Sequence, residues 1–341
     1  MTGLVHRRLF WPTALLVALL ALNIIAEPGF ASVRLQDGHL FGSIIDVLRN
    51  GSPTLLVALG MTLVIATRGI DLSVGAVVAI SGSIACTIIA GSPDPGSIGV
   101  VAVAILTAVA VALVLGGVNG TLVSIVGVQP IVATLILMTA GRGIAMLITE
   151  GQIISVSSPA YQVIGGGFFL LLPVSVLIAA VIFAGTALLT RKTALGMLIE
   201  SVGINPEASR LAGVRSRSIM MTVYVFSAVC AAVAGLMISS NVTAADANNA
   251  GLFIELDAIL AVVIGGTSLA GGRFSLIGTL LGALVIQMLT TTVYSVGIAP
   301  ELTLIFKALV VVAVCLLQSP ALSRRLARPR RLTPLTKEVV S

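Results

Sequence analysis

Three long stretches of this chain contain no Asp, Glu, Lys, Arg or His. They run from Pro95 to Gly141, from Ser218 to Ala245 and from Phe274 to Pro300. A helix needs about 20 consecutive apolar residues to cross the hydrocarbon core, so each stretch has room for one or two membrane spans. A membrane β-barrel would instead alternate apolar and polar residues in segments of about 10. That alternation is missing, and the sequence therefore predicts transmembrane helices.

Composition excludes a soluble globular protein. Charged residues make up 9% of the 341 residues and hydrophobic residues 57%, whereas soluble domains carry about 25% charged residues. Lipid must therefore cover much of the surface that water normally covers. Cys86, Cys230 and Cys315 each lie in an apolar stretch, and we interpret them as packing residues rather than disulfide partners or metal ligands.

We expect an all-α, polytopic membrane protein with about ten transmembrane helices. The first apolar stretch follows His6-Arg7-Arg8, as in a signal peptide. It lacks a clear small-x-small cleavage site and further spans follow, so we interpret it as an uncleaved helix. The expected helices span approximately Phe10–Ala26, Ile44–Thr67, Leu72–Gly91, Ser97–Val126, Pro130–Thr149, Phe169–Thr190, Ser218–Val242, Leu256–Leu269, Phe274–Val296 and Glu301–Ser319.

The basic residues predict how these helices are oriented. Cytoplasmic loops carry an excess of Lys and Arg, and most of the 19 such residues fall on one side if both termini are cytoplasmic. Residues 1–323 then form the transmembrane domain, and residues 324–341 form a basic cytoplasmic tail. We interpret the tail as a topology anchor rather than a nucleic-acid or lipid-binding patch. The residues expected on this side are Arg7, Arg8, Arg68, Arg191, Lys192, Arg210, Arg215, Arg217, Arg273, Arg324, Arg325, Arg328, Arg330, Arg331 and Lys337.

One cytoplasmic loop, residues 191–217, contains the pattern of a short and fully capped helix. Asn205 suits the N-cap and Pro206 the first helical turn. Glu207 complements the positive amino-terminal end of the helix dipole. Gly213 can adopt the left-handed conformation that closes a helix. The loop therefore predicts a helix of about two turns.

Such a helix is marginal alone in water, because helix nucleation is unfavourable. It needs a surface to pack on, and Ala208, Leu211 and Val214 offer a small apolar set around Ser209 and Arg210. These residues leave two interpretations equally open. The helix either rests on its own protein or docks on a partner.

A resemblance to a known family favours the second interpretation. Glu207-Ala208-Ser209, followed by Gly213, resembles the EAA-x3-G loop of permease subunits in ATP-driven (ABC) importers. In that family, the short helix inserts into a cleft of the ATPase subunit. The third motif position holds Ser209 rather than alanine, which is a mild departure.

Longer segments narrow the resemblance to sugar importers. Gly60–Gly75, which reads GMTLVIATRGIDLSVG, resembles the GMTxVIxxGGIDLSVG segment of ribose-type sugar permeases, with Arg68 at a usually small position. Ala261–Arg273 resembles the second signature of that family. Leu35–Ser43 and Ala245–Gly251 resemble the permeases for galactofuranose. The resemblance covers nearly the whole chain except the tail.

This resemblance implies the ABC importer permease fold and a translocating subunit, not an enzyme. The chain would move galactofuranose or a related monosaccharide from periplasm to cytoplasm across a bacterial inner membrane. A ribose-type permease for another sugar or small polar solute is the alternative. ATP and Mg would be held by a partner ATPase, so this chain carries no cofactor. The other implied partners are a second permease, either a sister chain or another copy, and a periplasmic sugar-binding protein. The ATPase coupling residues would be Asn205, Pro206, Glu207, Ala208, Ser209, Arg210 and Gly213.

Several polar and glycine residues within or between spans are candidates for the pathway or for a hinge. Irregular backbone at membrane depth is tolerated only where protein buries it or where it lines a wet cavity. Asp71 could instead cap the following helix through Ser73 or Val74, and small-residue packing explains the paired glycines equally well. The candidates are Gly69, Asp71, Ser73, Asn119, Gln129, Gly265 and Gly266.

Two further groups of polar residues carry predictions. Arg142 and Lys307 lie inside spans and must face protein or water, and we expect an acidic structural partner for Arg142. A short outer stretch is crowded with polar residues, and we expect it to contact the binding protein or to form the sugar's entrance, with ordinary loop solvation as the alternative. The residues of that stretch are Asp246, Asn248, Asn249, Glu255 and Asp257.

Other function classes lack their required features. A secondary transporter usually needs intramembrane acids and a tight internal site, whereas the acids here map to span ends. Aromatic residues are only 4% of the chain, so no tight sugar-stacking site is visible. A membrane enzyme needs a catalytic constellation, and His6 and His39 lie at the amino end and in an outer loop. An ATP-hydrolysing pump needs G-x-x-x-x-G-K-[ST], and the sequence has none.

Overall fold

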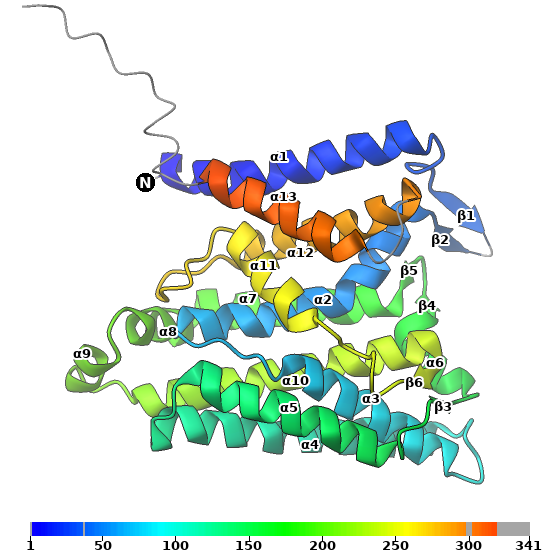
Figure 1. The fold of residues 1–341 in the computed structure, drawn as a ribbon, viewed down its shortest axis with the longest axis horizontal. Helices are drawn as coiled ribbons and strands as arrows, with labels where there is room; N and C mark the ends of the chain where they lie inside the picture. Colours follow the sequence, from blue (N-terminus) through cyan, green and yellow to red (C-terminus); the bar gives the residue numbers. More distant parts are fainter. Residues whose placement is uncertain (1, 37, 298–301, 319–341) are drawn as a thin grey trace, which may run out of the picture.

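The computed structural model describes residues 2–36, 38–297 and 302–318 and is mostly helical (Figure 1). The predicted tail, residues 324–341, lies outside the described residues, as do Asp37 and Glu301. The helical elements are α1 (Thr2–Ala26), α2 (Ser43–Ala66), α3 (Val74–Ala90), α4 (Ile98–Thr121), the π-helical turn η1 (Leu122–Val126), α5 (Pro130–Ile148), α6 (Pro159–Gly166), α7 (Val174–Lys192), α8 (Leu195–Ile204), α9 (Pro206–Leu211), α10 (Ser216–Val242), α11 (Ile254–Ile264), α12 (Leu276–Ser295) and α13 (Thr303–Gln318).

In the residues that the structure describes, three small antiparallel sheets of two strands each interrupt the helical chain. They add local strand structure to a chain expected to be all-α, and none of them forms a span. The pairs are β1 (Arg34–Gln36) with β2 (His39–Phe41), β3 (Ile154–Ser155) with β6 (Ala244–Ala245), and β4 (Phe168–Phe169) with β5 (Leu172–Pro173).

Each of the ten expected helices has a counterpart in the structure. In the described part of the chain, seven are long and apolar enough to cross a membrane: α1, α2, α4 with η1, α5, α7, α10 and α12. The counterparts α3, α11 and α13 are shorter, with 17, 11 and 16 residues. Three expected boundaries are wrong. The helix expected from Phe10 begins at Thr2. The helix placed at Phe169 begins at Val174 because the β4–β5 hairpin precedes it, and the helix extended to Leu269 ends at Ile264.

The helices lie side by side, and the connections at the two ends of the bundle differ (Figure 1). The start of α1 lies at the same end as α8 and α9, and we call this the α9 end. The six short strands gather at the opposite end, which we call the strand end. The chain therefore places its amino-terminal helix start and its capped short helix on one side of the bundle, as the basic residues predict.

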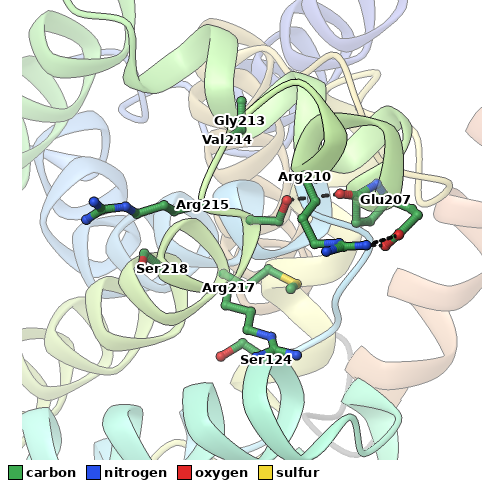
Figure 2. Close-up of a pocket in the computed structure, with 11 residues that line it drawn as sticks. Ser124, Glu207, Arg210, Gly213, Val214, Arg215, Arg217 and Ser218 are labelled. Carbon is green, nitrogen blue, oxygen red and sulfur yellow. Dashed lines mark hydrogen bonds and ion pairs between the residues drawn. The ribbon is translucent and has the colours of Figure 1, made fainter.

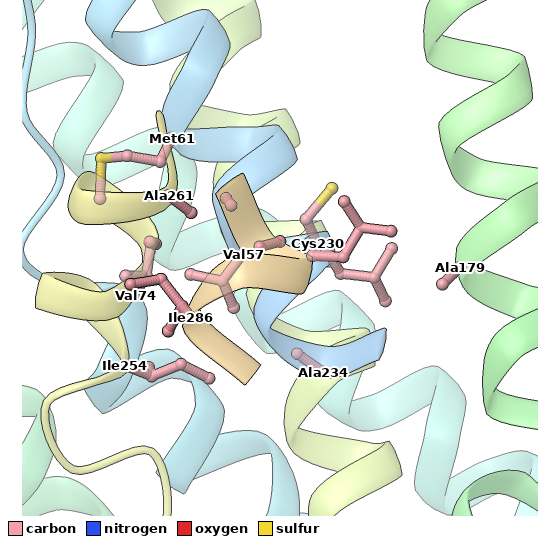
Figure 3. Close-up of a cluster of buried hydrophobic side chains, with 14 of the residues drawn as sticks. Val57, Met61, Val74, Ala179, Cys230, Ala234, Ile254, Ala261 and Ile286 are labelled. Atoms are coloured by element: carbon pink, nitrogen blue, oxygen red, sulfur yellow. The ribbon is translucent and has the colours of Figure 1, made fainter. Parts of the chain in front are cut away.

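Helix α10 packs against α2, α3 and α4 at the centre of the bundle. Small residues allow these backbones to approach closely: a Cβ added at Gly235 would overlap the backbone of Val78. Figure 3 shows part of the apolar cluster around α10, which includes Met61 and Cys230. Cys86 and Cys230 are free and buried in apolar clusters, which confirms the packing role predicted for these two residues.

Helices α3 and α11 both begin in the interior of the bundle and run toward opposite ends (Figure 1). Ala76 near the start of α3 packs against Gly141 of α5, which lies about 10 Å along α5 from its strand end at 1.5 Å per residue. Gly75 packs against the carbonyl oxygen of Gly251 and the carboxylate of Glu255, just before and within the first turn of α11. The segments that lead into these two helices, residues 67–73 and 246–253, therefore end in the interior of the bundle.

Candidate functional site

The α9 helix has the caps that its sequence predicts. The Asn205 side-chain oxygen accepts hydrogen bonds from the backbone N–H groups of Glu207 at 3.1 Å and Ala208 at 3.0 Å. Gly213 has a φ of 87° and donates its N–H to the carbonyl of Arg210 at 3.0 Å. Backbone groups at the ends of a helix have no partner within the helix. In α9, the Asn205 side chain and the Gly213 N–H supply hydrogen bonds to such groups at the two ends.

The apolar residues of α9 face outward. Leu211 is 77% exposed and Ala208 is also exposed, while Val214 is half-buried. Within α9 only Ser209 is buried. In the part of the chain that the structure describes, the helix thus leaves most of its apolar set uncovered. That geometry favours docking on a partner over packing on its own protein.

Glu207 and Arg210 form an exposed ion pair on the surface of α9. The Arg210 guanidinium donates to both carboxylate oxygens of Glu207, at 2.5 and 3.2 Å. Hydrogen bonding to Arg210 and its charge hold the pKa of the Glu207 carboxyl below its usual range. The helix therefore presents one organised negative and one organised positive group at neutral pH.

A cavity of about 800 Å³ opens beside this helix (Figure 2). Figure 2 shows Glu207 and Arg210 on one side of it, with Arg215 and Ser124 on others. Arg217 from the first turn of α10 also lines it. Neither Arg215 nor Arg217 makes an ion pair with another described residue. The cavity is therefore a basic recess suited to acidic groups of a partner.

A second group of candidate residues meets around the buried carboxylate of Asp71. Asp71 is 1% exposed and accepts hydrogen bonds from the Ser73 N–H at 3.1 Å and the Ser73 hydroxyl at 2.6 Å. The Asn119 amide donates to that hydroxyl at 2.8 Å, and Ser227 of α10 donates to the other carboxylate oxygen at 3.0 Å. The predicted capping bond to Ser73 is present, and the network joins the α2–α3 connection to α4 and α10.

Ser227 belongs to this network and Tyr224 lies beside it, but neither is predicted from the sequence. Tyr224 is 1% exposed, and its hydroxyl packs directly against Gly69. Thr134 of α5 also bonds the Ile70 carbonyl at 3.1 Å. Their only signal in the sequence was a polar residue inside a span, which does not identify a partner far along the chain.

The remaining pathway candidates do not join this network. Gln129 is exposed at the start of α5. Gly265 and Gly266 close α11, and Gly265 lies so near Gly278 of α12 that a Cβ on either would overlap the other's backbone. Close packing therefore accounts for Gly265, and the positive φ of 83° accounts for Gly266.

The α2–α3 connection also reaches the start of the α9 loop. The Arg68 guanidinium donates to the carbonyl of Ile204, the residue before the Asn205 cap. The Gly272 N–H donates to the Ala66 carbonyl at 2.9 Å. Arg68 thus links the capped helix physically to the segment that holds Asp71.

The polar residues of the predicted outer stretch have different surroundings. Glu255 is 7% exposed, and Asp257 pairs with Lys307. Asp246 accepts bonds from the backbone of Asn248 at 3.0 Å and of Asn249 at 3.2 Å. Asn248 and Asn249 are exposed, so their side-chain amides are the polar groups that this segment presents at the surface.

The two intramembrane cations have different partners. The Arg142 guanidinium donates to the carbonyls of Ala247 at 3.0 Å and Ala250 at 2.7 Å. The acidic residues Glu255 and Asp246 interact with its charge without forming an ion pair among the described residues. Lys307 of α13 donates to the Asp257 carboxylate of α11 at 2.8 Å. Both cations avoid lipid by fastening neighbouring elements.

We expect the Lys307–Asp257 pair to hold α13 against α11. Lys307→Ala should lower the stability of the purified protein by on the order of 3 kcal/mol, because it leaves a largely buried carboxylate unpaired. The exchange Lys307→Asp with Asp257→Lys should recover most of the loss. Thermal unfolding in detergent measures both effects, and an exchange variant no better than Lys307→Ala would contradict the pairing.

The comparisons with known proteins agree with this architecture. The family model described as Branched-chain amino acid transport system / permease component matches residues 43–315. The chain is 51% identical over 320 residues to the galactofuranose transporter permease protein of Escherichia coli (strain K12), covering 92% of each chain. No solved structure matches this chain.

Two further relatives are also import permeases. The chain is 41% identical over 347 residues to the fructose import permease protein of Bifidobacterium longum (strain NCC 2705), covering 99% of this chain and 96% of the relative. It is 36% identical over 305 residues to the ribose import permease protein of Haemophilus influenzae, covering 88% and 90%. The chain therefore belongs to this family of multi-pass permease components, the translocating subunits of bacterial ABC importers that work with an ATPase and a binding protein.

Proposed function

We propose that this chain translocates galactofuranose or a related monosaccharide from periplasm to cytoplasm. The observation that carries the substrate is the 51% identity, over 92% of both chains, to a galactofuranose transporter permease. The fructose and ribose permeases at 41% and 36% identity support a sugar as the substrate class. The family description names branched-chain amino acids instead, so an amino acid belongs among the tested solutes.

The proposed coupling element is α9, from its cap at Asn205 through Pro206, Ala208, Ser209 and the closing Gly213. Its exposed Leu211 and the Glu207–Arg210 pair form the contact surface, and the adjacent basic cavity receives acidic groups of the ATPase. ATP and Mg bind in that ATPase and not in this chain. Closure of the ATPase around nucleotide moves α9, and the Arg68 contact to Ile204 passes that displacement to the connection before α3.

The α9 end is proposed to be cytoplasmic and the strand end periplasmic. The support is the concentration of arginines at the α9 loop and the rule that basic loops stay inside. Both termini are then cytoplasmic, residues 1–323 form the transmembrane domain, and residues 324–341 are its basic tail. The pathway or hinge role proposed for Asp71, Ser73 and Asn119 belongs to the segment between these two faces.

The proposed assembly contains a second permease, either a sister chain or another copy, and a periplasmic sugar-binding protein. The binding protein approaches the strand end and delivers sugar toward Asp246, Asn248 and Asn249. Glu255 and Asp257 support that segment from within, since one is buried and the other is ion-paired.

A solute panel tests the substrate class. The complete importer is purified with its ATPase and binding protein, and ATP hydrolysis is measured with galactose (which contains the furanose form), fructose, ribose and leucine. We expect stimulation by the first sugar to be the largest and none by leucine. Stimulation by leucine alone would overturn the sugar assignment and favour an amino-acid permease.

A further inference from the structure

The segment between β6 and α11 brings an aromatic ring and a free amide into the span. Phe253 is 40% exposed and Asn248 is also exposed, although the adjoining Gly251 packs against Gly75 inside the bundle. The Asn248 side chain makes no hydrogen bond with any other described residue. Both groups are therefore exposed on a segment whose Gly251 end packs inside the bundle.

This segment is held in place from two sides. Arg142 donates to the carbonyls of Ala247 and Ala250. The Asp246 carboxylate accepts from the backbone N–H of Asn249 at 3.2 Å and from its side-chain amide at 2.7 Å. The loop is thus preorganised, and little conformational entropy is lost when its free groups bind a ligand.

Lipid hydrocarbon offers no hydrogen-bond partner to the exposed amide of this segment. An exposed amide inside the hydrocarbon region is costly, so residues of this type face protein or a water-filled cavity. Phe253 also has a φ of 63°, a left-handed conformation that is rare for a bulky residue. Strain of this kind persists where the surrounding structure fixes it, often at functional sites.

The two free groups match the chemistry of a sugar. An aromatic ring offers a flat apolar surface for the C–H face of a pyranose or furanose ring. A side-chain amide has both donors and acceptors for vicinal hydroxyls. Resting on the proposed function, we propose that Phe253 and Asn248 contact the sugar as it crosses the membrane. One ring and one amide bind a sugar only weakly, which suits a solute that must be released again.

The test uses the complete importer in proteoliposomes, with ATP inside and the loaded binding protein outside. The labelled sugar is whichever of galactose, fructose or ribose the wild type takes up fastest. Phe253→Ala and Asn248→Ala should each lower uptake at subsaturating sugar about 5- to 10-fold, as expected for one lost contact. In Phe253→Ala, ATP hydrolysis stimulated by the loaded binding protein should stay within about twofold of wild type, because Phe253 does not touch α9.

Two matched variants separate stacking from simple packing. Phe253→Trp keeps an aromatic face and should retain uptake, whereas Phe253→Leu keeps apolar volume without a ring and should not. Leu256 of α11 is 48% exposed, so Leu256→Ala serves as a neighbouring aliphatic control and should behave like wild type. Full uptake by Phe253→Leu, or an equal loss in Leu256→Ala, would overturn the sugar contact and indicate packing against the second permease.

A labelling measurement keeps the inference testable even if a variant assembles poorly. In a Cys315→Ser background, where Cys86 and Cys230 are buried, Asn248→Cys should react with a small water-soluble thiol reagent. Transported sugar should slow that reaction. No reaction, or a disulfide to the second permease, would contradict an open pathway here. Failure of the proposed function itself is distinguishable, because the wild type would then take up none of the three sugars.

Discussion

Replacing Glu207 by lysine is expected to reduce sugar uptake more than tenfold while leaving the protein in the membrane. The substitution puts a positive charge at the positive end of α9 and beside Arg210, so it reverses two favourable interactions. Glu207 lies outside the spans and is exposed, and membrane insertion should therefore be normal. Sugar uptake and the amount of ATPase subunit that co-purifies (the ATPase recovery) are measured at matched membrane abundance of the permease.

Gly213→Val tests the same helix through its backbone. The residue has a φ of 87° and open space around it, so valine adds left-handed strain of about 1–2 kcal/mol without a clash. Gly151 at the strand end is a matched control, with a φ of 70° and equally open surroundings. Gly213→Val should lose ATPase coupling, and Gly151→Val should keep it.

Wild-type uptake and ATPase recovery for both α9 variants would contradict the coupling assignment. Asp94→Lys provides the corresponding charge control for Glu207→Lys, because Asp94 is exposed at the strand end. Equal losses in Asp94→Lys would show a general charge effect rather than a lost contact at α9.

Removing the carboxylate of Asp71 is expected to have the second large effect. Asp71→Ala leaves the Ser73 N–H, the Ser73 hydroxyl and the Ser227 hydroxyl without their acceptor. Each buried donor left unsatisfied costs about 1–3 kcal/mol, so the connection before α3 should lose its fixed position. Uptake at matched abundance should fall more than tenfold, and thermal unfolding should occur at lower temperature.

Graded variants decide whether the network acts through these bonds. Ser227→Ala removes one bond, so it should lower uptake and the unfolding temperature less than Asp71→Ala does. Asp71→Asn keeps an acceptor for Ser73, so its losses of uptake and of unfolding temperature should lie between those of the other two variants. An Asp71→Ala variant with unchanged uptake and unchanged unfolding temperature would rule out a positioning role for this carboxylate.

The features predicted correctly from sequence are those whose partners lie close along the chain. Asn205, Glu207 and Gly213 specify α9 within nine residues, and Asp71 finds Ser73 two positions away. Long apolar helices were also predicted, because the bilayer requires about 20 apolar residues at a time.

What the sequence did not reveal depends on distant contacts or on ambiguous apolar runs. Ser227 meets Asp71 across 156 positions, and Arg142 reaches Ala247 across 105. The run Phe168–Pro173 is apolar throughout, and periodicity cannot distinguish a short strand from the start of a buried helix. The β4–β5 hairpin was therefore assigned to a helix.

The short strands also create a surface that the sequence did not suggest. His39 stacks on Phe168 with ring centroids 4.9 Å apart, and the Leu40 N–H donates to the Leu171 carbonyl at 3.0 Å. These contacts join the β1–β2 and β4–β5 hairpins at the strand end. Under the proposed orientation, this joined surface lies on the periplasmic side.

The central claim is that this chain forms the passage for the sugar and that a separate ATPase drives transport. Its most direct test is uptake of labelled sugar into proteoliposomes that contain this permease, its second permease and its ATPase. ATP is trapped inside, and the sugar-loaded binding protein is added outside. We expect sugar to accumulate inside only when internal ATP and an active ATPase are both present. Accumulation without ATP, driven by an ion gradient, would contradict it, as would no uptake by a complex that hydrolyses ATP.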